Sequence, residues 1–262
     1  DKNGDVTSHA RADGHFLTAA TDGTFAQKHF AHLERGDIRV VDGSPNLIIG
    51  TSFPVTVGED GAFYYPQVLS KGRVKIMRML PGKKAHQFAA LPPAREHSYT
   101  GEWVDAEWVW AIAAGPHGSI YYTEKHAVRR IDADGVVHTV AENVTVPGCE
   151  HPPAVTDSHV EPGLYGLDVA DDGTVYVAAS ACCAVLKIAP DGTQSIALRA
   201  TGGWSPQGVA VAGDTVYVLE YDYVKSDDRA DWLPRVRRVE ANGNATVIAQ
   251  IDKSMRAVAA KK

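Results

Sequence analysis

A four-strand sequence unit recurs along this chain, and this repeat restricts the fold more than any other feature. The clearest copy is GLYGLDVADDGTVYVAASACCAVLKIAPDGTQSIAL, residues 163–198, which predicts four short strands with turns at Asp172-Gly173 and Asp191-Gly192. Other copies begin at four places along the chain: Gly14, Ser52, Trp108 and Ser205. Since one four-stranded sheet cannot bury both of its faces, successive copies are expected to stack.

Alternating apolar residues support this interpretation within each unit. Val175 and Val177 in the second strand, with Val185 and Ile188 in the third, show the spacing of a sheet with two distinct faces. The sequence therefore predicts an all-β chain, a β-propeller of four-stranded blades. A β-sandwich of many hairpins is the alternative, although a sandwich does not require a repeated sequence register.

The first ten residues affect the expected number of blades. DKNGDVTSHA resembles IDADGVVHTVA at 131–141, which predicts an outermost strand at 1–13 belonging to a sixth blade. Either the polypeptide was trimmed upstream, as we expect, or five whole blades close the ring. The expected single propeller domain spans 1–262, with whole blades at about 14–51, 52–92, 107–145, 163–200 and 204–251.

The motifs of these units can be compared with known repeats. Pro-x-Gly-Val-Ala-Val, then Asp-Gly-x-Val-Tyr-Val-Ala, then Val-x-Lys-Ile near an Asp-Gly turn, resembles NHL repeats, which also occur in bacterial proteins grouped with the gluconolactonase and senescence-marker-protein family. The resemblance implies the propeller fold. Because such propellers include lactonases, lyases, peptide-amidating enzymes, sensors and protein-binding scaffolds, it leaves the activity open.

Composition excludes several classes of partner. Hydrophobic residues at 44% and charged residues at 22% suit a folded chain with a large core. A net charge of −6, with no dense run of Lys and Arg, argues against nucleic acid as a partner. No apolar run approaches the roughly 20 residues that cross a bilayer, so no membrane span is expected.

The first strand of every propeller blade lines the central channel, so equivalent positions on these strands should meet at one mouth. Aligning the copies by their Asp-Gly turns places five residues at the start of the innermost strand: His15, Phe53, Trp110, Tyr165 and Gln207. This largely aromatic ring predicts a pocket for a small-molecule ligand. The alternative is that the rings only fill the channel.

A second ring is expected at the end of the second strand. Its members are His29, Gln67, Glu124, Ala179 and Glu220. His29, Glu124 and Glu220 could hold a divalent cation, Ca or Zn, or act with His15 as catalytic acids and bases. The alternative is that the carboxylates are only solvated. The family resemblance implies a Glu with Asn or Asp ligands around a channel cation in lactonases, and histidines in amidating lyases; the innermost ring has no carboxylate here.

Three cysteines and a long loop form a further group. Cys149 could pair with Cys182 or with Cys183, and a disulfide there would pin the loop and predict an exported protein, secreted or periplasmic. A zinc site of Cys and His ligands is the alternative, but the spacing matches no familiar zinc finger.

The leading hypothesis is a small-molecule-binding propeller, with metal-assisted hydrolysis of a lactone or ester as the candidate reaction. The alternative is a non-catalytic NHL sensor or protein-interaction module. Its protein partner would bind the loops at 92–107, 145–163 and 221–233 through three aromatic anchors: Trp103, Trp204 and Trp232.

Overall fold

The computed structural model describes the chain in two compact units, Asp1–Glu107 and Trp108–Lys262. The described residues are 15–19, 25–29, 39–40, 54–68, 73–80, 83–92, 96–97, 103–104, 109–124, 126–149, 163–222 and 233–250. Within these ranges the helical structure consists of two 3₁₀ turns, η2 (Pro116–Gly118) and η3 (Ser180–Cys182). No helix in this part of the chain has the length and apolar character needed to span a membrane.

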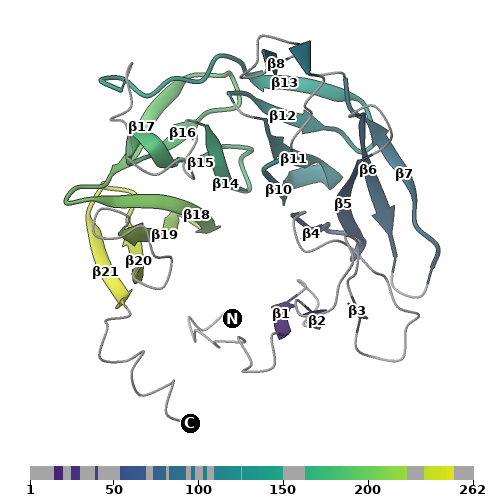
Figure 1. The fold of residues 1–262 in the computed structure, drawn as a ribbon, viewed down its shortest axis with the longest axis horizontal. Helices are drawn as coiled ribbons and strands as arrows, with labels where there is room; N and C mark the ends of the chain where they lie inside the picture. The colour runs from purple at the N-terminus through teal and green to yellow at the C-terminus, as the bar shows by residue number, and fades with distance from the viewer. Residues whose placement is uncertain are drawn as a thin grey trace. The chain divides into compact units, whose positions relative to one another are not determined.

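The second unit contains three four-stranded antiparallel sheets, each built from strands that follow one another in sequence (Figure 1). The first sheet consists of β10 (Ala111–Ala114), β11 (Ile120–Thr123), β12 (Val128–Ile131) and β13 (Val137–Ala141). The second consists of β14 (Leu164–Val169), β15 (Val175–Ala179), β16 (Ala184–Ile188) and β17 (Gln194–Arg199). The third consists of β18 (Trp204–Ala212), β19 (Thr215–Asp222), β20 (Leu233–Val239) and β21 (Ala245–Gln250).

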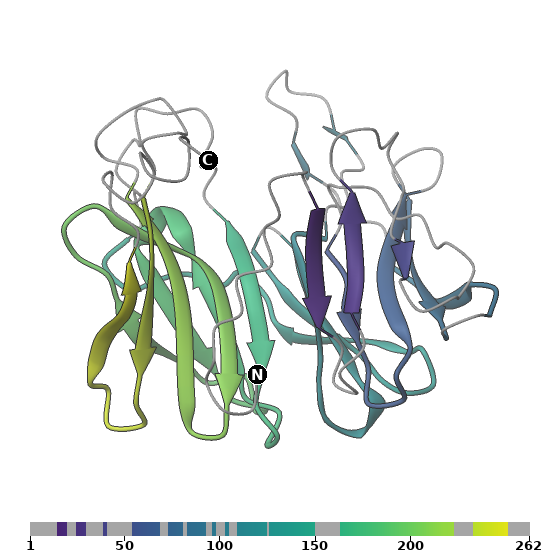
Figure 2. The same cartoon turned by 90° about the horizontal axis from the view of Figure 1, so that it is seen from below.

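The first unit contains a fourth sheet of the same order. It consists of β4 (Thr56–Val57), β5 (Phe63–Val68), β6 (Val74–Met79) and β7 (His86–Ala90). Strands β1 (His15–Ala19), β2 (Phe25–His29) and β3 (Arg39–Val40) form a three-stranded sheet, in which the purple strands β1 and β2 lie side by side (Figure 2). A short pair, β8 (Glu96–His97) with β9 (Trp103–Val104), completes the unit's described strands.

Asp-Gly turns close the hairpins as the sequence predicts. Gly173 and Gly192 have φ angles of 83° and 84°, which glycine adopts without steric cost. The Asp172 carboxylate accepts the backbone N–H of Thr174 at 2.8 Å, and Asp191 accepts that of Thr193 at 2.9 Å. These side chains satisfy backbone donors inside the turns, so the repeated dipeptide fixes where each strand reverses.

The hydrophobic core of the second unit lies between its sheets. Val175 and Val177 of β15 are fully buried in one cluster with residues of the first sheet, such as Val128. On the other side of the same sheet, Val185 packs with Val218 of β19. Strand β14 contacts both β10 and β18, so the first strands of successive sheets lie side by side (Figure 1).

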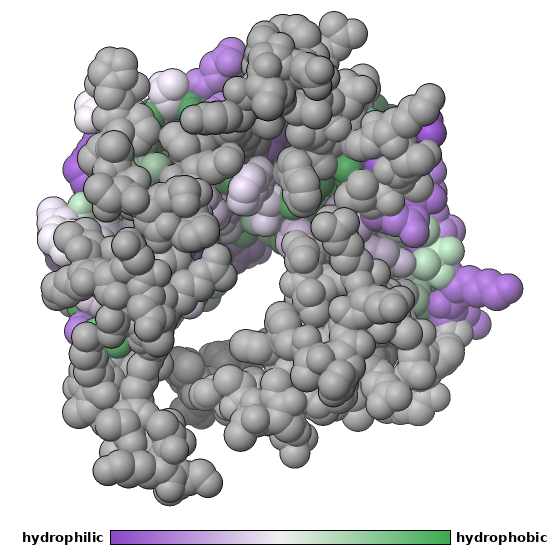
Figure 3. All heavy atoms as spheres, viewed as in Figure 1, coloured by the Kyte–Doolittle hydropathy of each residue, from purple (hydrophilic) through white to green (hydrophobic). Residues whose placement is uncertain are grey.

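The last strand of each four-stranded sheet is the most exposed one. Strand β21 has five exposed positions out of six, and β17 has four out of six. In the space-filling view, hydrophilic residues occupy much of the described outer margin (Figure 3). The side chains therefore grade from apolar between the sheets to polar at the last strands, as expected of blades that stack face to face.

A disulfide joins two connecting segments of the second unit. Cys149, in the segment after β13, bonds to Cys182 of η3, and their Cα atoms lie 5.7 Å apart. This is one of the two pairings that the sequence left open. Cys183 keeps a free thiol, and burial raises the pKa of that thiol, with a further increase from the charge of Glu220.

Candidate functional site

Two aromatic rings meet where β10 and β14 begin. The rings of Trp110 and Tyr165 lie 5.3 Å apart between centroids and are tilted by 58°. Trp110 is 39% exposed, although it is a large apolar side chain directly before a buried strand. The structure thus brings two members of the predicted innermost ring together and leaves Trp110 partly exposed.

Irregular backbone marks the equivalent positions on two innermost strands. The β14–β15 register shifts between Leu164 and Leu167, and the β18–β19 register shifts between Pro206 and Gly208. Tyr165 and Gln207 therefore lie inside bulges. Bulges concentrate next to functional sites because they turn a side chain away from the regular alternation of a strand.

Glycine permits a close approach of these two bulges. A Cβ atom added at Gly166 would lie 2.6 Å from the carbonyl oxygen of Gln207 and 2.8 Å from the Cα atom of Gly208. Both are backbone atoms that cannot move aside as a flexible side chain would. Gly166 thus holds β14 and β18 near each other where Tyr165 and Gln207 lie.

Hydroxyl groups tie each innermost strand to the preceding sheet. Thr123 accepts the backbone N–H of Ala111 at 3.0 Å and donates to the carbonyl of Tyr165 at 3.3 Å. In the next sheet, the buried Ser180 hydroxyl donates to the carbonyl of Pro206 and accepts from the side-chain amide of Gln207. These bonds orient the bulged segments, and Ser180 fixes the Gln207 amide.

Glu124 follows the last residue of β11, as the alignment of the repeats predicts. Its carboxylate accepts from Nε of Arg129 at 3.1 Å, and the same guanidinium bonds to Glu142 at 2.7 Å. About a fifth of the Glu124 side chain is exposed. A carboxylate already paired with arginine is a weaker candidate for a cation ligand than a free one.

Glu220 lies within β19 rather than at its end, because β19 continues to Asp222. The side chain has no exposed surface. One carboxylate oxygen accepts from Nε of Arg235 at 2.5 Å, and the other lies 3.7 Å from a nitrogen of Arg237. In this conformation Glu220 lies out of reach of a ligand that approaches from solvent.

The remaining predicted residues belong to the first unit, except for Ala179. His15 and His29 occupy directly paired positions of β1 and β2. Gln67 is exposed on β5, opposite Lys75. Phe53 lies outside the described residues. Ala179 is the last residue of β15 in the second unit, buried and without polar atoms in its side chain.

The carboxylates of the candidate cation site have other partners. Within the described ranges, no group of three or more His, Cys, Asp or Glu side chains is positioned to hold a metal ion. Glu124 forms an ion pair with Arg129, and Glu220 forms one with Arg235. The described carboxylates of the predicted ligand set therefore do not fit a divalent cation.

The aromatic anchors expected of a protein-binding surface were also located. Trp204 lies under the guanidinium of Arg235, with the Cζ atom 3.9 Å from the ring centroid. Trp103 is in β9, and Trp232 lies outside the described residues. The described anchor Trp204 thus packs against the chain's own arginine.

Sequence reasoning missed the partners of these groups. Arg129 and Arg235 neutralise the two carboxylates, and Ser180 orients Gln207. The pairing of Glu220 with Arg235 could have been predicted, because the antiparallel register of β19 and β20 places these two residues directly opposite each other. The bulges also had a signal, because glycine follows both Tyr165 and Gln207.

The sheets define this chain as a β-propeller. No protein-family model matches the sequence. A stretch of 116 residues, 44% of the chain, is 30% identical to a virginiamycin B lyase from Nocardia farcinica and spans 36% of the length of that curated relative.

Two solved structures show the fold. Virginiamycin B lyase from Staphylococcus aureus superposes with a TM-score of 0.58 at 16% identity, over 96% of this chain and 76% of that one. Regucalcin from Agrobacterium tumefaciens, a calcium-binding protein, superposes with a TM-score of 0.51 at 14% identity. The superposition covers 86% of this chain and 73% of that one. The predicted all-β propeller class is therefore confirmed, whereas NHL type and blade number stay predictions.

Proposed function

We propose that this chain binds a small organic ligand at the starts of its innermost strands and acts on it enzymatically. The observation that carries the proposal is the Trp110–Tyr165 pair, in which Trp110 is 39% exposed and Tyr165 lies in a bulge of β14. The exposed part of a tryptophan side chain gains no stabilisation from burial, because its apolar surface stays in contact with water. A ligand ring stacked on this part would provide that burial.

Gln207 supplies the polar group of the proposed site. Its amide nitrogen donates to Ser180, which leaves the amide oxygen as an acceptor with a defined direction. A ligand that presents an N–H or O–H group beside its ring would suit this arrangement. Apolar walls with a few oriented polar groups are typical of small-molecule sites.

The proposed reaction opens a cyclic ester or related ring. The sequence match to a virginiamycin B lyase supports elimination over hydrolysis as the reaction type, and the arginine-bound Glu124 and Glu220 weaken the case for metal-assisted hydrolysis. In the first unit, His15 and His29, at directly paired positions of β1 and β2, are the proposed proton-transfer groups. Phe53 and Gln67 are further proposed ligand-binding residues.

Two further parts of the proposal rest on single observations. A divalent cation is supported by the calcium-binding neighbour, and elemental analysis of the purified protein tests it. Export to a secreted or periplasmic location is supported by the Cys149–Cys182 disulfide, because such bonds persist in oxidising compartments.

Binding is tested by calorimetric titration with virginiamycin B and a panel of simple lactones. Tyr165→Ala should weaken binding at least about tenfold, equivalent to about 1.4 kcal/mol. Tyr176→Ala is the matched control, because Tyr176 is also a half-buried tyrosine but contacts Lys187 on β16. Equal loss in the two variants, or no binding by the parent chain, would contradict the proposed site.

Mass spectrometry of the products separates the reactions. Hydrolysis of a cyclic ester adds the mass of one water, whereas elimination leaves the mass unchanged. A product of unchanged mass, lost in His29→Ala, supports the proposed lyase. Ligand binding without any product would reject the enzymatic part and favour a sensor.

A further inference from the structure

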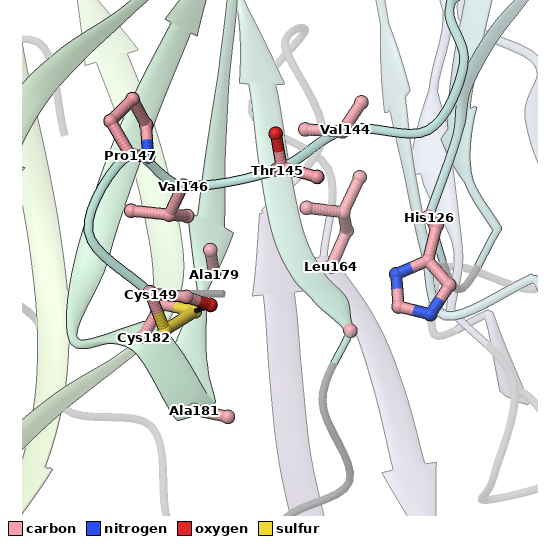
Figure 4. A pocket seen from close by; sticks show the side chains of 11 residues that line it. His126, Val144, Thr145, Val146, Pro147, Cys149, Leu164, Ala179, Ala181 and Cys182 are labelled. Atoms are coloured by element: carbon pink, nitrogen blue, oxygen red, sulfur yellow. Dashed lines mark hydrogen bonds between the residues drawn. A yellow bond between two sulfur atoms is a disulfide. The ribbon is translucent and has the colours of Figure 1, made fainter. Parts of the chain in front are cut away.

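A second cavity lies in the same unit, apart from the aromatic pair. It has a volume of about 410 Å³. Its walls come from the segment that follows β13, the start of β14, and the end of β15 with η3 (Figure 4). None of Trp110, Tyr165 and Gln207 lines it. We propose that this cavity is a separate binding site for a compact, uncharged, mainly apolar molecule.

The wall chemistry defines the class of ligand. Val146, Leu164, Ala179 and Ala181 supply apolar surface, and no Asp, Glu, Lys or Arg is among the described lining residues. An ionic group in this cavity would lose hydration without gaining a counter-charge. The described wall therefore suits a neutral ligand, whose binding is driven by burial of apolar surface.

Polar groups occur at two places on the wall. His126 and Thr145 both line the cavity and both remain solvent-exposed. In the close-up, the imidazole of His126 lies beside Leu164, whereas Thr145 lies between Val144 and Val146 (Figure 4). One hydrogen-bonding group on an otherwise apolar ligand would suit this rim.

The walls are held before any ligand binds. The Cys149–Cys182 disulfide is part of the lining and joins the segment after β13 to η3. The N–H of Val144 donates to the carbonyl of His126 at 2.9 Å, and Arg199 donates to the carbonyl of Pro147 at 2.8 Å. A cavity fixed in this way loses little conformational entropy on binding, which favours affinity.

The size of the cavity sets an upper bound on the ligand. Its volume falls in the lower part of the range of about 300–1,000 Å³ usual for small-molecule pockets. A molecule of two or three linked rings fits this volume. This inference does not rest on the proposed function, because the two sites share no lining residue and can be removed separately.

The test compares two fluorescent probes with the same ring skeleton. N-phenyl-1-naphthylamine is neutral, and 1-anilinonaphthalene-8-sulfonate adds one sulfonate to it. Titrated into the full 262-residue chain, the neutral probe should show saturable one-to-one binding, and the sulfonate at least tenfold weaker binding. Equal binding of both probes, or no saturable binding of the neutral one, would overturn the proposal.

Variants then assign the probe to the cavity. Thr145→Trp places an indole in the cavity from an exposed position and should weaken binding of N-phenyl-1-naphthylamine at least tenfold. Thr246→Trp is the matched control, because Thr246 is exposed on β21. If Thr145→Trp does not give the native far-ultraviolet spectrum, Thr145→Phe, which also places a ring in the cavity, carries the test. Retained binding in the folded Thr145 variant would overturn the assignment.

A third variant separates this site from the proposed ligand site. Trp110→Ala should leave binding of the neutral probe within twofold of the parent, because Trp110 does not line the cavity. Loss of the probe in Trp110→Ala, with retention in the Thr145 variant, would place the probe on the aromatic pair and refute the second site.

Discussion

The buried carboxylate of Glu220 gives a sharp test of what stabilises the last sheet. Arg235→Ala removes the guanidinium whose Nε lies 2.5 Å from that carboxylate. Glu220 has no exposed surface, so water cannot replace the lost partner. Removing one partner of a buried ion pair costs about 3–5 kcal/mol.

Two further contacts refine this magnitude. The second carboxylate oxygen accepts no hydrogen bond within the described part of the chain, and Arg237 lies 3.7 Å away from it. Arg237 therefore supplies charge compensation without a short hydrogen bond. The substitution also removes the stacking of Arg235 on Trp204, worth about 0.5–2 kcal/mol. We expect a total loss of about 4 kcal/mol.

Urea denaturation followed by circular dichroism measures the loss as a lower midpoint. Arg238→Ala is the matched control, because Arg238 is on the same strand and pairs at 3.0 Å with the exposed Glu240. An exposed pair contributes about 0–1 kcal/mol. If Arg235→Ala costs no more than Arg238→Ala, Glu220 is not held as a buried charge and the reasoning fails.

Three other predictions follow from particular contacts. Reduction of the Cys149–Cys182 disulfide, which closes a sequence separation of 33 residues, should lower the free energy of unfolding by about 3–4 kcal/mol, measured by thermal unfolding with and without dithiothreitol. The Cys183→Ser variant should lose the same stability on reduction, because Cys183 is not part of the disulfide. Gly166→Ala should cost about 1–3 kcal/mol by urea denaturation, because its Cβ would meet the backbone of β18; an unchanged midpoint would refute the close approach. Burial raises the pKa of Asp168 above its ordinary value despite hydrogen bonds from the backbone of Val211 and Val169, so the native state binds the proton more tightly than the unfolded state does. The resulting stabilisation is fully present below about pH 3.8 and is lost as pH rises through the raised pKa. Asp168→Asn should abolish this slope in the free energy of unfolding measured across pH.

The fold could be predicted from the sequence because its signals are local and repeated. An Asp-Gly dipeptide such as Asp172-Gly173 fixes a turn through backbone geometry and a side-chain hydrogen bond to a residue two positions on. Alternation then assigns the buried face of each strand, as with Val175 and Val177. Repeating these short-range signals defines a series of similar sheets without knowledge of any long-range contact.

The environment of the candidate site could be predicted only in part. Aligned positions placed Trp110 and Tyr165 at equivalent strand starts, and their rings do meet. The alignment could not show that β19 extends past Glu220 to Asp222, which moves that carboxylate from a strand end into the interior. Whether a carboxylate is free or paired depends on side chains from another strand, here Arg235, and local patterns do not specify them.

The partial exposure of Trp110 is the feature that core packing explains least well. Val128 and Val177, which fill the core of the same unit, bury all of their surface. Trp110 remains 39% exposed while bulged strands, Gly166 and the Thr123 hydroxyl hold the backbone around its partner Tyr165. Ordering so many backbone groups around an incompletely buried aromatic pair has no evident benefit for packing. It is the arrangement expected if the missing contact surface is provided by a ligand.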